Sequence, residues 1–297
     1  MRALPGSPLP ALVLVTAVWG YTFVPVQDAI AVFPLFGFLA VRFAISALAL
    51  APFALGSLRR TPRAGIVGGC IAGLLLALAY ALQTAGLDLT TVSSTGFITG
   101  LYVLFTPLLA LAMFRTPVPA VLWAGAGLSI VGLLLLSGVP GGSLAGNMLV
   151  LGNALAQAFQ IALIERFAPR YDARALTFVQ LSISCAVFVV LAGARGELEW
   201  PTDGTVWYGA IASGVFAGAL GYLIATWVQA RTTAARAALV FTLEAPFAAL
   251  FGVLLAGDHL GWIGWAGCAV MLAGILLAEP AAANALRRLW GAAPTAG

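Results

Sequence analysis

The sequence predicts an all-α integral membrane protein with ten transmembrane helices, arranged as two inverted repeats of five helices. Three observations lead to this prediction. The composition is strongly apolar, ten separate apolar runs are long enough to span a bilayer, and the two halves share motifs in the same order. Of the 297 residues, 62% are hydrophobic and only 8% are charged, whereas soluble domains carry roughly 25% charged residues. A soluble globule cannot cover such a chain with polar surface.

The charged and sulfur-containing residues exclude several classes of function. All 14 basic residues are arginines scattered between apolar runs, which is not the pattern of a nucleic-acid-binding surface. His259 is the only histidine in the sequence, which argues against a histidine-based metal site. Cys70, Cys185 and Cys268 lie inside apolar runs, where we expect small buried hydrophobic residues rather than a redox pair.

Ten apolar runs are candidates for membrane spans, because a helix needs about 20 apolar residues to cross a hydrocarbon core of about 30 Å. We expect spans over residues 9–28, 34–55, 64–87, 92–113, 118–138, 146–165, 174–193, 205–228, 235–256 and 261–279. The remaining connections average about eight residues, which leaves no room for a soluble domain. The first run follows Arg2 but contains Trp19 and Pro25 and lacks a convincing small-residue cleavage site, so we expect a retained helix rather than a signal peptide.

The arginines predict the orientation of these spans. With the N-terminus in the cytoplasm, the inside segments hold Arg2, Arg59, Arg60, Arg63, Arg115, Arg166, Arg170, Arg174, Arg231, Arg236, Arg287 and Arg288. The outside segments hold only Arg195, together with the acidic residues Asp28, Asp88, Glu197, Glu199, Asp203 and Asp258. Because cytoplasmic loops carry the excess of positive charge, both termini are expected to be cytoplasmic.

The two halves of the chain, residues 1–142 and 143–297, read as copies of one five-span unit. Motifs that match in the same order are Arg42 with Gln180, Ser93-Ser94 with Thr232-Thr233, Pro107 with Pro246, Trp123-Ala124-Gly125 with Trp265-Ala266-Gly267, and Gly132 with Gly274. Only short gaps are needed to align them. Five spans per unit is an odd number, so the second copy enters the bilayer from the opposite face. Inverted repeats of this kind are typical of secondary transporters, although an old duplication without transport would leave the same pattern.

Several motifs resemble those of the EamA-type transporters of the drug/metabolite transporter superfamily. They are the run Trp19-Gly20-Tyr21-Thr22-Phe23-Val24, the triplet Val41-Arg42-Phe43, Gly100-Leu101-Tyr102 with Thr106-Pro107, and Leu243-Glu244-Ala245-Pro246-Phe247. The resemblance covers residues 9–279. It implies a central cavity lined by helices 1–4 and 6–9, with helices 5 and 10 peripheral, and small organic solutes that are often exported from bacteria. The sequence departs from the family in one place: an acidic residue often follows spans 4 and 9, but only Asp258 fits, and Arg115-Thr116-Pro117 follows span 4.

Prolines in corresponding positions of the two halves point to a transporter site. Pro107 and Pro246 fit that description, and Pro25 lies inside the first span. Each proline lacks an N–H group and frees the carbonyl four residues earlier, at Val103, Thr242 and Tyr21 respectively. We expect helix breaks near these three prolines, with a packing kink as the alternative.

Polar side chains recur at helical spacing on four spans, and polar groups in a bilayer turn toward protein or water. One such face carries Thr95, Thr99, Tyr102 and Thr106, and others carry Asn153, Gln157 and Gln160, then Tyr222, Thr226 and Gln229, then Tyr80, Gln83 and Thr84. Interhelical hydrogen bonds explain any one of these residues, but four such faces favour a wet cavity. The expected cavity residues are Trp19, Tyr21, Thr22, Arg42, Tyr80, Gln83, Thr95, Thr99, Tyr102, Gln157, Gln160, Gln180, Tyr222, Thr226 and Glu244.

Two charged residues lie deep within predicted spans. Arg42 is expected about 12 Å from the outer face and Glu244 about 13–14 Å from the inner face, at 1.5 Å per helical residue. Their depths differ by only about 5 Å in a core of about 30 Å, so we expect them within reach of each other. Glu244 is either a group that couples transport to protons or binds a substrate ammonium, or a structural partner of Arg42.

The sequence therefore predicts a transporter, not an enzyme, that moves a small amino-acid-like, amphipathic or aromatic solute across a bacterial cytoplasmic (inner) membrane, most simply as an exporter. We expect no cofactor or metal, coupling to protons as the open question, no nucleic-acid partner, and a monomer or homodimer in the lipid bilayer. The alternatives are a non-transporting scaffold or complex subunit, a channel, and an intramembrane protease. The protease hypothesis rests on Tyr171-Asp172 and Gly257-Asp258, which are expected on opposite faces of the membrane.

Overall fold

The computed structural model describes residues 9–87, 89–90, 92–138, 143–257 and 259–278. Every regular element within these ranges is a helix. The expected contributions of Arg2, Asp88, Asp258, Arg287 and Arg288 to the orientation fall outside the described residues.

Nine segments of the described chain are long and apolar enough to cross a membrane. Six are single helices: α1 (Leu9–Val32), α2 (Leu35–Leu58), α3 (Arg63–Leu87), α6 (Ala120–Ser137), α7 (Leu144–Phe167) and α8 (Ala173–Arg195). Three combine shorter elements: α4 (Val92–Gly100) with α5 (Tyr102–Phe114), α9 (Gly204–Ile211) with the π-helix η1 (Ala212–Gly221) and α10 (Tyr222–Gln229), and α11 (Ala234–Phe241) with α12 (Glu244–Phe251) and the π-helix η2 (Gly252–Ala256). The shorter apolar helix α13 (Trp262–Ala278) follows.

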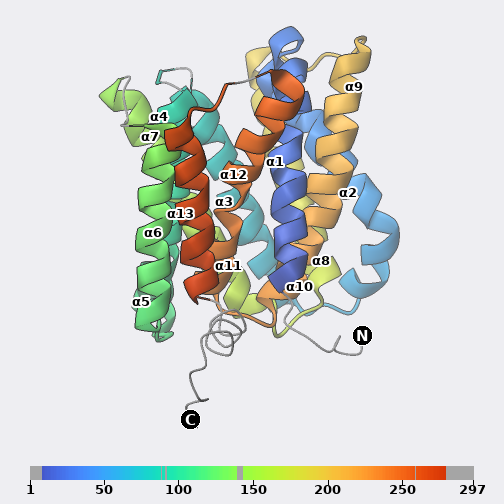
Figure 1. Cartoon of the computed structure of the whole chain (residues 1–297). Helices are drawn as coiled ribbons and strands as arrows, with labels where there is room; N and C mark the ends of the chain where they lie inside the picture. The colour runs from blue at the N-terminus through green and yellow to red at the C-terminus, as the bar shows by residue number, and fades with distance from the viewer. Residues whose placement is uncertain (1–8, 88, 91, 139–142, 258, 279–297) are drawn as a thin grey trace.

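The prediction of an all-helical membrane protein is confirmed, and each of the ten expected runs coincides with a helical segment. The boundaries and the interiors differ in detail. Helix α1 continues to Val32, beyond the expected end at residue 28. The fourth segment is interrupted at Leu101, and the ninth at Thr242 and Leu243. Helices α1 and α13 respectively begin and end at the same end of the bundle (Figure 1).

Short polar side chains and glycines define where many helices begin and end. Ser143, Asp172, Asp203 and Thr233 each precede a helix and accept a hydrogen bond from a backbone N–H of its first turn. Helix α8 ends at Gly196, which has the left-handed conformation at φ 71° that glycine adopts without strain. These caps hold the connections short, which keeps the spans packed as one bundle.

Helices α6 and α13 lie side by side through facing glycines (Figure 1). A Cβ atom on Gly125 would lie 2.8 Å from the carbonyl oxygen of Gly274, and one on Gly132 would lie 2.6 Å from that of Gly267. The two contacts run in opposite directions along the chain, so the helices are antiparallel. Small residues let transmembrane backbones approach this closely where no larger side chain fits.

Serine hydroxyls make two further close contacts between helices that are far apart in the sequence. Ser46 in α2 donates to the carbonyl oxygen of Gly214 in η1 at 2.8 Å. Ser184 in α8 donates to the carbonyl oxygen of Gly73 in α3 at 2.9 Å. Both serines are buried, and both contacts again join a small polar residue to a glycine. The helices that carry the central polar residues are therefore held at short distances.

We predict that Gly132→Leu destabilises the protein, because the new side chain would collide with the backbone of Gly267 and with Met271. Overpacking of a close contact costs about 1–3 kcal/mol. Gly127→Leu on the same helix is the matched control, since a Cβ at Gly127 has open space within 4 Å. Thermal unfolding of the two purified variants in detergent measures the difference. Equal melting temperatures would contradict the close α6–α13 contact.

Candidate functional site

The buried arginine of α2 is held by aromatic groups. Arg42 is 8% exposed, and its Nη2 donates to the hydroxyl of Tyr80 in α3 at 3.3 Å. The guanidinium carbon lies 5.3 Å from the ring centre of Tyr80 and 5.8 Å from that of Phe43, within the range of cation–π attraction. Arginine stays charged, so these contacts replace part of the hydration that burial removes.

Glu244 lies in the same electrostatic neighbourhood as Arg42. It is the first residue of α12, directly after the interruption of the ninth segment, and its side chain is half-buried. The charges of Arg42 and Glu244 act on each other, and that of Glu244 acts also on Tyr102 and Tyr222. No salt bridge joins Arg42 to Glu244, although the structure describes both residues. The two charges share a region without neutralising each other by direct contact.

Trp19 of α1 forms the aromatic part of the site. Its ring centre lies 5.4 Å from that of Tyr222 and 5.3 Å from that of Phe241. Its Nε1 donates to the carbonyl oxygen of Ala217 within η1 at 2.9 Å. These rings border a cavity that is also lined by Gln157, Gln160, Ile161, Ala225, Thr226 and Gln229. Its volume is about 10 Å³, room for about one water molecule.

Buried amide groups line this cavity or contact its lining, and their hydrogen-bonding groups are only partly paired. Gln160 donates through Nε2 to the Oε1 of Gln180 at 3.1 Å. The Nε2 of Gln180 and the Oε1 of Gln229 are buried and have no hydrogen-bond partner among the described residues. Leaving a buried polar atom unpaired costs roughly 1–3 kcal/mol. One unpaired donor and one unpaired acceptor therefore favour a polar occupant in this region.

A second group of polar side chains links three helices beside the cavity. The hydroxyl oxygen of Thr99 in α4 accepts from Nδ2 of Asn153 in α7 at 2.8 Å and from Nε2 of Gln83 in α3 at 3.2 Å. Thr95 is buried on the same helix as Thr99, and Tyr102 is buried at the start of α5. This group brings together residues of three of the predicted polar faces.

Two of the expected cavity residues make other contacts. The hydroxyl of Tyr21 forms a hydrogen bond with that of Tyr208 in α9, and its ring lies edge-on to Phe251 at 5.5 Å. Thr22 is buried and donates to the carbonyl oxygen of Trp19 in its own helix at 2.8 Å. The structure thus directs Tyr21 toward α9 and α12, and Thr22 toward the backbone of α1.

The prolines interrupt the helices less uniformly than the sequence predicts. Pro246 lies at the third position of α12, and its segment is interrupted at Thr242, where a freed carbonyl was expected. Pro107 lies within α5, whose segment breaks six residues earlier, at Leu101. Pro25 lies within the continuous helix α1. The chain is thus interrupted near Pro246, whereas Val103 and Tyr21 lie within continuous helices.

The sequence analysis missed two parts of the site. Phe241 forms one aromatic wall, but as the last apolar residue of α11 it has no distinguishing neighbour pattern. The carbonyl oxygen of Ala217, which accepts the hydrogen bond from Trp19, lies in the π-helix η1. No residue pattern in the sequence predicts a π-helix there. The glycines of that segment, Gly214, Gly218 and Gly221, are the one visible signal of irregular backbone there.

Asp172, one of the two aspartates of the protease hypothesis, is engaged in another role. Asp172 caps α8 and is bound by Arg174, whose Nε and Nη2 lie 3.0 and 2.7 Å from its carboxylate oxygens. These hydrogen bonds hold the pKa of Asp172 below its usual range, whereas an aspartyl protease needs one carboxyl group that keeps its proton. Asp258 lies outside the described residues.

Comparisons with known proteins point to one family. The model of the EamA-like transporter family matches the chain twice, over residues 7–138 and 144–278. A protein of Archaeoglobus fulgidus described as an uncharacterized transporter is 30% identical over 269 residues, which cover 90% of this chain and 83% of that protein. One solved crystal structure has a TM-score of 0.77 and 18% identity, over 92% of this chain and 97% of the other. That likeness concerns the fold alone.

Proposed function

The chain belongs to the EamA-like transporter family, and on that premise we propose that it moves a small organic solute by alternating access. The observation that carries this proposal is the group of Arg42, Tyr80, Tyr222 and Glu244, all of them buried or half-buried within membrane segments. Charged residues inside a bilayer are costly, and they mark substrate or ion pathways. The group includes two opposite charges that form no ion pair with any described residue, and its Tyr222 also lines the cavity of aromatic rings and amides.

Contacts between α6 and α13 support an inverted repeat. In the register that aligns Trp123 with Trp265, Gly125 corresponds to Gly267 and Gly132 to Gly274. Gly125 approaches Gly274, and Gly132 approaches Gly267. Gly125 therefore contacts the equivalent of Gly132, and Gly132 contacts the equivalent of Gly125. This reciprocal exchange is the contact pattern of a twofold axis. Because the helices are antiparallel, that axis runs across them, as in transporters with inverted topology.

The serine contacts follow the same twofold relation. Ser46 corresponds to Ser184 in the register that aligns Arg42 with Gln180, and Gly73 corresponds to Gly214 after a short gap. Each serine of one half donates to the matching glycine of the other half. Two independent pairs of helices thus support the same symmetry, and both family matches respect the boundary near residue 143. We take residues 1–142 and 143–297 as the two inverted repeats of ten spans in total.

The small size of the central cavity is the reason why helices must move for a solute to pass. With room for about one water, it holds no organic solute in this conformation. A solute enters only if helices on one side separate, and it leaves only if they separate on the other. The interruptions at Leu101 and at Thr242 lie six and four residues before the matched prolines. They supply one flexible point in each repeat for such movements.

The charges of the site favour an amino-acid-like or amphipathic solute. Arg42 has a tyrosine but no carboxylate as its direct partner, so it attracts a substrate carboxylate. Glu244, which has no ion pair, attracts an ammonium group or a proton. The rings of Trp19, Tyr222 and Phe241 give an apolar or aromatic side chain a surface to pack against. Export across a bacterial cytoplasmic membrane, with protons as the coupling ion, completes the proposal.

Release from proteoliposomes loaded with a metabolite extract tests the proposal directly. We predict selective and saturable loss of a few compounds, detected by mass spectrometry, with a proton gradient of one sign accelerating it. Loss without saturation or counterflow would indicate a channel instead. No selective loss from well-folded protein under either gradient would favour the scaffold hypothesis and overturn the proposal.

We predict that Glu244→Gln abolishes proton-driven flux of the identified compound but spares its exchange. The amide keeps the shape and removes the titrating group, so only steps that need the proton should fail. Glu199→Gln is the control, because Glu199 is exposed outside the membrane segments. Equal loss of driven flux and exchange in well-expressed Glu244→Gln would assign a structural role to Glu244.

We predict that both termini are cytoplasmic. Arg59, Arg60, Arg63, Arg115, Arg166, Arg170, Arg174, Arg231 and Arg236 all lie in or beside connections on the side where α1 begins, and Arg195 lies on the other. In a variant without the three native cysteines, a membrane-impermeant maleimide should label Glu199→Cys in intact cells and Thr116→Cys only after permeabilisation. The reverse pattern would refute the orientation.

A further inference from the structure

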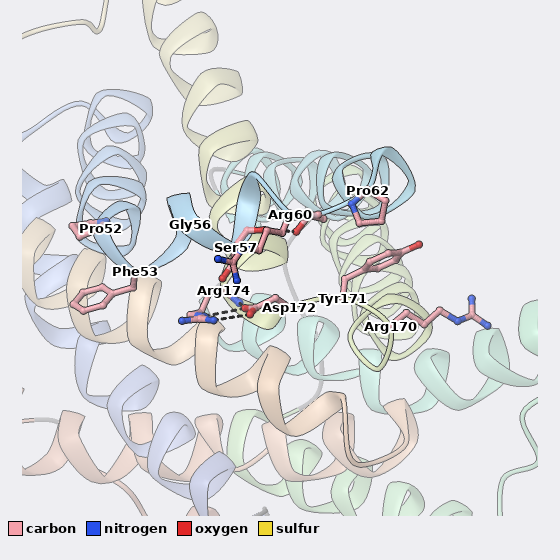
Figure 2. Close-up of a pocket in the computed structure, with 11 residues that line it drawn as sticks. Pro52, Phe53, Gly56, Ser57, Arg60, Pro62, Arg170, Tyr171, Asp172 and Arg174 are labelled. Carbon is pink, nitrogen blue, oxygen red and sulfur yellow. Dashed lines mark hydrogen bonds and ion pairs between the residues drawn. The ribbon is translucent and has the colours of Figure 1, made fainter. Parts of the chain in front are cut away.

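A cavity of about 390 Å³ opens where α2 ends and α8 begins, away from the central site. Its walls are the last turns of α2, the α2–α3 connection and the α7–α8 connection (Figure 2). Pro52 lies inside α2 at the entrance to this region. A proline in a helix interior removes one backbone hydrogen bond of the helix. None of the residues discussed for the central site lines this cavity.

The polar wall of the cavity carries excess positive charge. It contains Arg60, Arg170 and Arg174 together with a single carboxylate, Asp172. Asp172 is engaged by Arg174 in an ion pair of 2.7 Å, which Figure 2 shows as the dashed contact at the centre of the site. Arg60 and Arg170 have no ion pair among the described residues. Two positive charges therefore remain uncompensated, beside the hydroxyl of Ser57.

The other wall of the cavity is apolar and faces outward. Phe53, which lines the cavity together with Pro52, is 66% exposed. Phe53 lies five residues before the helix end at Leu58, which corresponds to a depth of about 7.5 Å at 1.5 Å per residue. Gly56, in the next turn, has no atom within 4 Å of the position of a Cβ. The cavity therefore has a basic level at the membrane surface and an open apolar level beneath it.

We propose that this cavity binds an anionic phospholipid, with the phosphate against Arg60, which has no ion pair within the described part of the chain, and an acyl chain along Phe53. Guanidinium groups bind phosphate oxygens through charge-assisted hydrogen bonds, and basic pockets between membrane helices recognise lipid head groups. A soluble phosphate shares the head-group chemistry but makes no use of the exposed apolar wall. The apolar wall, continuous with the outer surface of α2, favours the lipid.

Such a lipid would connect the two proposed repeats. Arg60 follows α2 in the first half of the chain, and the part of the cavity lining from Arg170 to Arg174 belongs to the second. A lipid held in the cavity touches α2 and α8, the helices that also carry Arg42 and Gln180 of the central site. Lipid binding is therefore expected to raise the thermal stability of the folded protein.

Native mass spectrometry of the full-length protein in detergent tests this site. We predict preferential retention of phosphatidylglycerol over phosphatidylcholine, and a roughly tenfold weaker retention in Arg60→Gln, as the loss of a charge-assisted contact implies. Arg166→Gln is the matched charge control, because Arg166 is exposed at the same end of the bundle but does not line the cavity. Its retention should equal that of the unmodified protein.

A second pair of variants tests the cavity without changing charge. Gly56→Leu fills the open space near the helix end and removes a glycine from a helix, so folding should not suffer. It should weaken phosphatidylglycerol retention, whereas Gly127→Leu, at an equally open glycine of α6, should not.

Three results would overturn the proposal. Equal retention of both lipids, or equal losses in the control and test variants, would indicate only diffuse attraction. Displacement of phosphatidylglycerol by millimolar glycerol phosphate or inorganic phosphate would assign the cavity to a soluble anion. Solute release from proteoliposomes is measured on the same variants, so failure of the lipid site and failure of the transport proposal are distinguishable.

Discussion

A permanent positive charge buried among helices governs the arrangement of the central site. Arginine side chains keep their charge in proteins, so the bundle must compensate the buried charge of Arg42. The phenol of Tyr80 and the faces of two aromatic rings do so only in part. The remaining field extends to Tyr222 and Glu244. The tyrosines, the break before α12 and the position of Glu244 at its start all lie within that field.

Around this charge the scaffold is close to symmetric, whereas the chemistry is not. The glycine and serine contacts repeat between the halves. Arg42, however, corresponds to Gln180, and Glu244 corresponds to Phe105 in the register that aligns Pro107 with Pro246. Each charge therefore occurs in one half only. A symmetric frame can adopt two symmetry-related openings of similar energy, while an asymmetric site gives one solute a defined orientation within it.

Composition and spacing predicted the features that depend on the bilayer as a solvent. Apolar runs identified the spans, and the rarity of charge made Arg42 and Glu244 conspicuous. Helical rise converts sequence position into depth, so the sequence placed the two residues at similar depths, and their charges act on each other. The irregular backbone segments were harder to predict from the sequence. The π-helix η1 and the break at Leu101 depend on how neighbouring helices pack, and Pro107 alone did not locate that break. The sequence also does not specify which face of a helix turns toward the cavity. For this reason Tyr21 was expected in the cavity, whereas its hydroxyl contacts that of Tyr208.

The unpaired amides favour the proposal that a solute binds at the cavity, although the cavity has room for about one water. Gln180 and Gln229 each keep a buried polar atom without a partner among the described residues, and each such atom raises the free energy of the closed state by roughly 1–3 kcal/mol. A solute with its own donors and acceptors would remove that cost on entering, so part of the binding free energy would come from groups the empty protein leaves unsatisfied. The same unpaired atoms destabilise the closed bundle when no solute is bound. They therefore bias the empty bundle toward opening, which an alternating-access cycle requires for its return step.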